Sequence, residues 1–338
     1  MLADGTFIQN RYQIVRKIGQ GGMGAVYEAI DTRLGNRVAL KQTIVEGEQF
    51  DRAFEREARL LASLRHAALP VVSDFFSEGE GQFLIMQYIP GDDLATLLKQ
   101  RSHPFPVDQV LDWADQILSV LEYLHRQEPP IIHRDIKPQN LKLTSEGQVV
   151  LLDFGLAKGM QQSQTTTTTR SLFGYTPQYA PMEQIQGTGT DSRSDLYAVG
   201  ATIYNLLSGQ APADALTRGS RMLSGEADSL KPVHEINAEV PVALSQVLLQ
   251  AMSMNPRERF QTATAMRMAL QQPNAPAMTG ETVHMTPLPP VPATGPTQRV
   301  LTSPRPAESV TQRPERPATP VIPPEPAVGH SQTANPRR

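Results

Sequence analysis

Short runs that alternate apolar and polar positions fill the first 90 residues and predict β-strands. They are bounded by glycine, proline or charged residues, as strands commonly are. The runs cover residues 12–18, 25–29, 38–43, 71–77 and 83–88. Between them, residues 50–64 place an apolar side chain every three or four positions, which predicts a helix. We therefore expect a small β-rich lobe that contains one helix.

After Gly91 the apolar period becomes helical. Residues 107–126 place most of their apolar side chains on one helical face, which predicts an amphipathic helix. Residues 194–207 and 241–252 predict two more helices. The pattern indicates a larger α-rich lobe downstream of the β-rich one, and hence an α+β architecture.

The pattern ends near residue 271. Residues 273–338 hold 16 of the 29 prolines, no aromatic residue and no sustained apolar period. Such a segment buries too little apolar surface to offset the entropy of ordering, so we expect 271–338 to be a Pro-rich disordered tail. Its composition fits either a spacer or a docking segment.

Charge and cysteine content narrow the class of protein. The net charge of −3 gives no bulk electrostatic reason to expect nucleic acid or an anionic membrane as a partner. With no cysteine, the chain has neither disulfides nor thiolate metal sites. We see no secretory signal and no run of 18 apolar residues, and we expect a cytoplasmic protein without a transmembrane segment.

A glycine-rich loop is the first candidate for chemistry. Gly19, Gly21 and Gly24 form a Gly-x-Gly-x-x-Gly pattern, in which glycine lets the backbone approach phosphate groups closely. A dinucleotide-binding turn would need a helix next, but residues 25–29 predict a strand. An ordinary glycine turn is the other reading of the motif alone.

Two charged residues follow in the β-rich part. Lys41 ends the apolar run 38–41, where an unpaired ammonium would be costly to bury. A phosphate or a carboxylate would each be a suitable partner, and Glu57 on the predicted helix is a candidate. Taken alone, the two residues would more often be solvated surface charges, but their position between the glycine-rich loop and the next motif favours a functional pair.

Residues 133–140, His-Arg-Asp-Ile-Lys-Pro-Gln-Asn, are the strongest signal. Asp135 could accept a hydroxyl proton, Lys137 could neutralise a moving phosphoryl group, and Asn140 could hold a magnesium ion. Pro138 favours a loop rather than a helix. Asp153 follows a buried-looking strand and offers the hard oxygen ligand that magnesium prefers, although Asp-Phe-Gly could also be a simple turn.

Together these motifs resemble the Hanks-type serine/threonine protein kinases, and more narrowly the bacterial branch. The Gly-rich loop, strand lysine, His-Arg-Asp loop and Asp-Phe-Gly occur in the family's order. The resemblance implies a bilobal protein-kinase fold over residues 12–270. The N-lobe would cover about 12–89 and the C-lobe about 90–270, with an N-terminal extension at 1–11.

The resemblance also implies which residues bind ATP. Lys41 would hold the α- and β-phosphates and pair with Glu57. Met86 resembles the gatekeeper, and Gln87, Tyr88 and Ile89 resemble the hinge that binds adenine through backbone atoms. The loop residues that would cover ATP are Ile18, Gly19, Gln20, Gly21, Gly22, Met23, Gly24, Ala25 and Val26.

By the same resemblance, Asp135 is the catalytic base, and Asn140 and Asp153 bind Mg²⁺. Lys137 is typical of serine/threonine rather than tyrosine kinases. Thr176 resembles the threonine that contacts both Asp135 and Lys137.

The C-lobe sequence contains two more family motifs, one of them altered. Asp195 resembles the residue that holds the catalytic loop in place. The usual Ala-Pro-Glu motif has Met182 in place of proline, yet Glu183 can still pair with Arg259.

A run of threonines indicates regulation. Arg134 precedes the catalytic aspartate, and in this family such an arginine commonly binds a phosphate on the activation loop. The candidate autophosphorylation sites are Thr165, Thr166, Thr167, Thr168, Thr169 and Ser171. A phosphate there would add nearly two negative charges for Arg134 to pair with. A polar loop without a role is the alternative.

We therefore expect an active enzyme that transfers phosphoryl groups from ATP to protein serine and threonine residues. A pseudokinase scaffold is disfavoured because Lys41, Asp135, Asn140 and Asp153 are all present. A small-molecule kinase is disfavoured by residues 156–183, which resemble a peptide platform. Family resemblance also raises a homodimer as a possible assembly.

Overall fold

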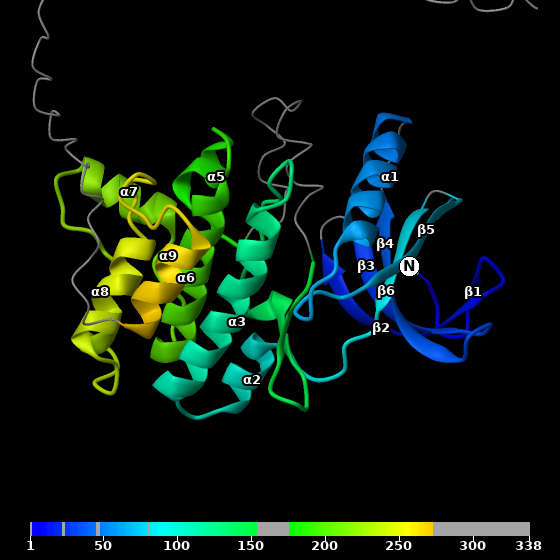
Figure 1. The fold of residues 1–338 in the computed structure, drawn as a ribbon, viewed down its shortest axis with the longest axis horizontal. Coiled ribbons are helices and arrows are strands. Elements are labelled where there is room, and N and C mark those ends of the chain that lie inside the picture. Colours follow the sequence, from blue (N-terminus) through cyan, green and yellow to red (C-terminus); the bar gives the residue numbers. More distant parts are fainter. Residues whose placement is uncertain (1, 22–23, 45–47, 80, 154–175, 273–338) are drawn as a thin grey trace, which may run out of the picture. The chain divides into compact units, whose positions relative to one another are not determined.

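The computed structural model describes residues 2–21, 24–44, 48–79, 81–153 and 176–272. The described residues fall within one compact unit, Met1–Thr279. A β-sheet with one helix forms the N-lobe, and a helical C-lobe follows it (Figure 1). The expected bilobal α+β fold is confirmed, while the expected tail lies outside the described residues.

An antiparallel sheet with strand order β1-β2-β3-β4-β6-β5 forms the N-lobe. Its strands are β1 (Phe7–Ile8), β2 (Tyr12–Gly21), β3 (Gly24–Asp31), β4 (Asn36–Ile44), β5 (Val72–Glu78) and β6 (Gly81–Gln87). The five strands predicted from alternation are confirmed, and β1 escaped notice because two residues show no period. The predicted helix is α1 (Glu48–Ser63).

The sheet is buried on both faces. Tyr12, Tyr27 and Leu40 belong to a cluster on one side, and Ala58 and Leu61 of α1 belong to the cluster on the other. Strand β6 is buried from Gly81 to Met86, and its apolar run lacks polar alternation because both faces are covered. The sheet therefore provides a firm base for Lys41 on β4.

Seven helices of the described residues lie in the C-lobe. They are α2 (Leu94–Gln100), α3 (Val107–His125), α5 (Met182–Gln186), α6 (Ser192–Ser208), α7 (Ala215–Leu223), α8 (Val242–Ala251) and α9 (Ala263–Gln271). The predictions for α3, α6 and α8 are confirmed to within two residues at each end. The other four are short, so their apolar period is too brief to stand out. Across the described ranges, no helix has both the length and the apolarity needed to cross a membrane.

Helix α6 is the centre of the C-lobe. It begins at a capping box formed by Asp191 and Ser194, and it ends at Gly209 in the left-handed conformation. Residues 194–208 are all buried, so α6 has no solvent-facing stripe. A helix surrounded in this way can hold polar groups at fixed positions for its neighbours.

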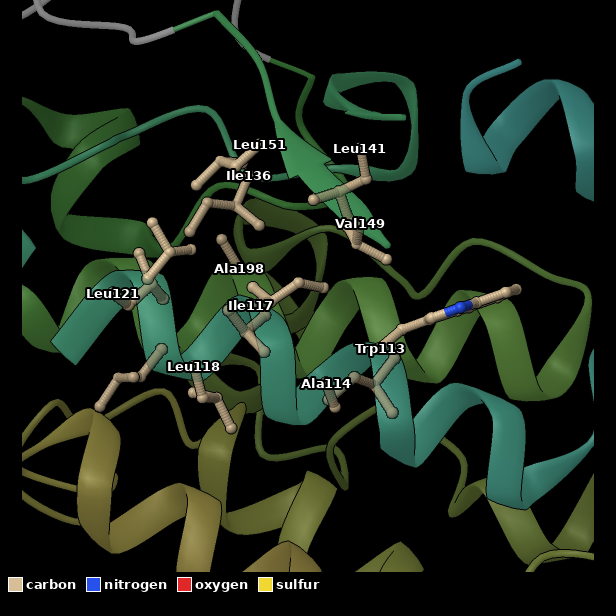
Figure 2. Packing of buried hydrophobic residues seen from close by; sticks show 14 of the residues in the cluster. Trp113, Ala114, Ile117, Leu118, Leu121, Ile136, Leu141, Val149, Leu151 and Ala198 are labelled. Atoms are coloured by element: carbon tan, nitrogen blue, oxygen red, sulfur yellow. The ribbon is translucent and has the colours of Figure 1, made fainter. Parts of the chain in front are cut away.

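Helix α3 connects the core of the C-lobe to the segment that carries the His-Arg-Asp loop. Ile117 and Leu121 point from α3 toward Ile136 and toward a small hairpin (Figure 2), whereas the Trp113 ring packs against Phe105. That hairpin consists of β7 (Leu141–Leu143) and β8 (Val149–Leu151). The chain between α3 and β8 thus carries the His-Arg-Asp loop on top of packed apolar side chains.

We predict that Leu118→Ala lowers the free energy of unfolding by about 2–5 kcal/mol. Leu118 is fully buried on α3, and truncation would leave a cavity in addition to the lost burial. Denaturant unfolding followed by circular dichroism measures the change. Leu223→Ala is the matched control, because Leu223 is 92% exposed. Equal effects of the two substitutions would contradict the proposed core.

Candidate active site

A buried carboxylate holds the His-Arg-Asp loop. Asp195, on the first turn of α6, accepts hydrogen bonds from the backbone N–H groups of His133 and Arg134, each at 2.9 Å. Its Oδ2 also lies 2.9 Å from Nε2 of His125, at the end of α3. Arg134 has a φ of 66°, a left-handed conformation that a non-glycine residue keeps only when its surroundings impose it. The expected role of Asp195 in holding this loop is confirmed.

His133 is a structural part of the loop. Its Nδ1 accepts the backbone N–H of Asp135 at 3.3 Å, so Nε2 carries the proton and donates to the carbonyl of Leu152 at 3.1 Å. Burial lowers the pKa of His133, although the charges of Asp195 and Asp135 act in the opposite direction. A neutral imidazole therefore connects the loop to the residue before Asp153.

Three predicted site residues meet at one carboxylate. Lys137 Nζ lies 3.2 and 3.1 Å from the two carboxylate oxygens of Asp135. Asn140 Nδ2 donates to Oδ2 of Asp135 at 2.9 Å and to its backbone carbonyl at 2.7 Å. These contacts fix the orientation of the Asp135 carboxylate before any substrate arrives.

Thr176 does not join this cluster. Within the ranges that the structure describes, no hydrogen bond links Thr176 to Asp135 or Lys137, in contrast to the family pattern. Its backbone carbonyl instead accepts the N–H of Tyr179 at 3.0 Å, as part of a turn. The threonine contacts expected from the resemblance are therefore not formed in this structure.

Lys41 and Asp153 form an ion pair across the two lobes. Lys41 Nζ on β4 lies 2.9 Å from Oδ1 of Asp153, which follows β8 with a φ of 54°. The positive charge of Lys41 lowers the pKa of Asp153 despite its burial. Burial acts to lower the pKa of Lys41, but the charge and hydrogen bond of Asp153 leave it raised.

The expected ion pair between Lys41 and Glu57 is absent from the described residues. Asp153 holds the ammonium group, and Glu57 makes no salt bridge to it within 4.0 Å. Burial raises the pKa of Glu57 to about 7, and the charge of Lys41 offsets only part of that rise. Glu57 thus lies in a poorly solvated position, and among the described residues its carboxylate has no salt-bridge partner within 4.0 Å.

The glycine-rich loop joins two antiparallel strands. Gly19 pairs with Val26 and Gly21 pairs with Gly24, so β2 leads directly into β3. The dinucleotide-binding alternative, which needs a helix here, is wrong. A Cβ atom at Gly24 would collide with the backbone carbonyl of Gln42, so this position requires glycine. Gly22 and Met23 lie outside the described residues.

The hinge segment follows β6. Met86 and Ile89 are buried, while Gln87 is exposed. The backbone carbonyl of Ile89 accepts a hydrogen bond from Lys142 Nζ at 2.9 Å, and burial lowers the pKa of Lys142. Sequence reasoning missed Lys142, because a lysine after the Asn140 motif looks like an ordinary strand residue.

Helix α5 is tied to the base of the C-lobe and to the catalytic loop. Arg259 donates to both carboxylate oxygens of Glu183, at 2.7 and 3.1 Å, so the predicted pair is confirmed despite Met182. Gln184 Nε2 donates to the backbone carbonyl of Arg134 at 2.8 Å. The guanidinium of Arg134 donates to Thr190 Oγ1 at 2.8 Å. The candidate phosphorylation sites at 165–169 and 171 lie outside the described residues.

The residues that could hold a metal are few. Across the described ranges no group of three or more His, Asp or Glu side chains gathers as a metal site. Magnesium beside phosphates needs only one or two protein ligands, because phosphate oxygens and water supply the rest. The Asn140 amide nitrogen is engaged by Asp135, which leaves its oxygen as the possible ligand beside Asp153. This donor set fits magnesium bound to a nucleotide.

We predict that Glu57→Gln stabilises the protein increasingly as the pH rises from 5 to 8. The folded state keeps the Glu57 proton up to a pKa of about 7, whereas the unfolded state releases it near 4.5. Wild-type stability therefore falls across this window, and the neutral variant avoids a loss on the order of 3 kcal/mol at pH 8.

Denaturant unfolding without nucleotide, repeated at several pH values, tests this. Glu55→Gln is the control on the same helix, since Glu55 is exposed and pairs loosely with Arg59 at 3.7 Å. A difference between Glu57→Gln and wild type that does not grow with pH would show that Glu57 is ionised in the folded protein.

Known proteins are similar to this chain in sequence and in fold. Residues 12–273 match the protein kinase domain family. A probable serine/threonine-protein kinase from Clostridium acetobutylicum is 36% identical over 262 residues, which cover 77% of this chain and 39% of the relative. PrkC, a serine/threonine-protein kinase from Bacillus subtilis, is 33% identical over 268 residues, covering 78% of this chain and 40% of PrkC.

Solved structures are similar in fold to this chain. PpkA-294 in its apo form has a TM-score of 0.66 and 27% identity, covering 80% of this chain and 99% of that one. A mutant Mycobacterium tuberculosis PknI kinase domain has a TM-score of 0.64 and 25% identity, covering 81% and 100%. The chain spans about two fifths of the length of the first curated relatives that it matches. The fold, the loop around Asp135 and these similarities together show that the chain belongs to the protein kinase domain family.

Proposed function

We propose that the chain transfers the γ-phosphoryl group of ATP to serine and threonine hydroxyls of proteins. The observation that carries the proposal is the Asp135 carboxylate, which Lys137 and Asn140 hold in a fixed orientation. That loop rests on Asp195, so the geometry exists before a substrate binds. Relatives named as serine/threonine-protein kinases support the choice of acceptor.

The nucleotide would lie between the glycine-rich loop and the hinge. Residues 18–26 would cover the phosphates, and backbone atoms of 87–89 would recognise adenine. Lys41 lies on the adjoining strand and would bind the α- and β-phosphates. For this, Lys41 must leave Asp153, and we propose that it then pairs with Glu57, whose charge lacks a close partner here.

Asp153 and Asn140 would hold Mg²⁺ with the phosphates. The metal, when bound, supplies positive charge against the phosphate oxygens. With that charge beside it, Asp153 would no longer depend on Lys41 for charge compensation. The pKa of Asp153, already below its ordinary value, keeps the carboxylate ionised for that purpose.

The reaction needs orientation more than covalent chemistry. The acceptor hydroxyl would hydrogen-bond to Asp135, its oxygen would attack the γ-phosphorus, and the bond to the β-phosphate oxygen would break. Asp135 would receive the hydroxyl proton. Lys137, 3.1 Å from Asp135, would offset negative charge on the transferring group.

Control would come from the segment that precedes Thr176. We propose autophosphorylation within Thr165–Thr169 or at Ser171, with Arg134 as the phosphate partner. In this structure the guanidinium of Arg134 binds only a neutral hydroxyl, that of Thr190, among the described residues. A phosphate would be a far stronger partner for it. Binding of that phosphate by Arg134 would then bring Thr176 to Asp135 and Lys137.

The setting of the domain is part of the proposal. We place the catalytic domain at 12–270 with a Pro-rich tail after it, and we place the protein in the cytoplasm because the reaction consumes ATP. Protein substrates are the expected partners. A homodimer is proposed by resemblance to the family.

We predict that Asp135→Asn lowers turnover by about 10²–10⁴-fold while leaving ATP affinity within a few-fold of wild type. Asparagine keeps the shape but cannot accept the hydroxyl proton. Phosphate transfer to a generic basic protein and nucleotide binding are measured on the same preparation. Asp112→Asn, at an exposed site on α3, should change neither. Near-normal turnover in Asp135→Asn would exclude Asp135 as the base.

We predict that protein produced with ATP carries phosphate within residues 165–171. Changing Thr165–Thr169 and Ser171 to Ala should lower activity by about tenfold or more, because Arg134 would lose its charged partner. Intact-protein and peptide mass spectrometry locate the phosphate. A fully active alanine variant, or an unmodified segment in active wild type, would show that this switch does not operate.

A further inference from the structure

We propose that Gln184 is a positioning residue for the catalytic base. Its side-chain amide holds the backbone carbonyl of Arg134, and this contact sets the peptide plane that leads into Asp135. The inference rests on the proposed function of Asp135 and adds to it a residue outside the His-Arg-Asp loop. It concerns how the base is held in place.

The peptide bond between Arg134 and Asp135 is held at both of its polar atoms. Its carbonyl accepts from Gln184 Nε2 at 2.8 Å, and its N–H donates to Nδ1 of His133 at 3.3 Å. A peptide unit fixed on both sides cannot rotate without breaking one of these bonds. Rotation would swing the Asp135 side chain away from Lys137 and Asn140.

Arg134 gives this restraint its importance. With a φ of 66° it occupies a conformation that arginine does not favour, so the native loop needs contacts that hold it there. One contact is the N–H of Arg134 on Asp195, at 2.9 Å. Gln184 supplies the second, on the carbonyl of the same residue. Loss of either contact frees Arg134 to return toward ordinary backbone angles.

Gln184 is itself firmly supported. Its side chain is 7% exposed, and its backbone N–H donates to the carbonyl of Pro181 at 3.1 Å. The preceding residue, Glu183, pairs with Arg259 and accepts from Ser194 Oγ at 2.8 Å. A donor on such a support can restrain the loop instead of following its motion.

Residues 184–190 make two hydrogen bonds with Arg134. Gln184 binds its carbonyl, and Thr190, six residues later, accepts from its guanidinium at 2.8 Å. The chain that follows Thr176 is therefore connected to the backbone before Asp135. A shift of α5 would pass to the catalytic base through the Gln184 contact.

The test compares two changes at Gln184 with one at Gln186. Gln184→Met keeps the length of the side chain but removes the donor. Gln184→Glu places an acceptor opposite the Arg134 carbonyl when ionised and an O–H donor when protonated. Gln186→Glu is the matched control, because Gln186 is exposed on the same helix. Turnover and KM for ATP are measured between pH 6 and 8, together with thermal midpoints.

Gln184→Met should lower kcat by about tenfold at every pH, with KM for ATP unchanged within about twofold. Gln184→Glu should lose more than Gln184→Met at pH 8. Its kcat relative to wild type should rise as the pH falls, because the protonated acid restores a donor. Gln186→Glu should match wild type throughout.

Retention of wild-type kcat in folded Gln184→Met would overturn the proposal. The proposal would also be overturned if kcat, ATP affinity and thermal midpoint fell together and Gln184→Glu did not recover activity at low pH. That result would show that Gln184 has only a structural role. Amide hydrogen exchange of a peptide spanning 133–137 gives a readout that does not depend on activity. Exchange should speed up in Gln184→Met and not in Gln186→Glu. Unchanged exchange in Gln184→Met would refute the proposed Gln184 contact. A wild type that cannot transfer phosphate would refute the proposed function instead, and the exchange measurement would still test the contact.

Discussion

Burial of the Asp195 carboxylate is the constraint on which the rest of the site depends. A charged group with no solvent exposure is tolerated only when hydrogen-bonding partners surround it, and here they are the backbone N–H groups of His133 and Arg134 together with His125. The loop's N–H groups stabilise the buried carboxylate. The carboxylate in turn holds the loop, because Arg134 is kept away from its preferred backbone angles. Core packing beneath Ile136 completes the arrangement (Figure 2). Stability and catalytic geometry therefore share the same contacts.

Lys41 binds one of the two carboxylates that are candidates for pairing with it. It binds Asp153 here, while Glu57 is left in a poorly solvated position with a pKa of about 7. One ammonium cannot contact both carboxylates at once, so ionisation of Glu57 is disfavoured while Lys41 binds Asp153. A bound nucleotide with its metal would remove that conflict by adding both positive and negative charge.

The sequence predicts those strands and helices in which the apolar period of a strand or of a helix repeats several times. Strands β2 to β6 and helices α1, α3, α6 and α8 follow from alternation and from helical spacing. Asp135, Lys137 and Asn140 were found because all three lie within six residues of one another. Gln184 and Lys142 could not be predicted in this way, since each donates a hydrogen bond to a backbone carbonyl that is far away in sequence. The pairing of Lys41 with Asp153 instead of Glu57 was equally unpredictable, because the sequence names both acids but does not give their distances from Lys41.

The position of Asp195 near the start of α6 makes the site sensitive to residue number as well as to residue type. Each residue added to or removed from an α-helix turns the remainder of that helix by about 100°. One insertion between Asp191 and Asp195 would point the carboxylate away from the loop, whatever side chains were kept. Beyond Gly209, where the helix has ended, the same insertion would leave Asp195 in place. We therefore expect insertions and deletions in related chains to fall after Gly209 and to spare the first turn of α6.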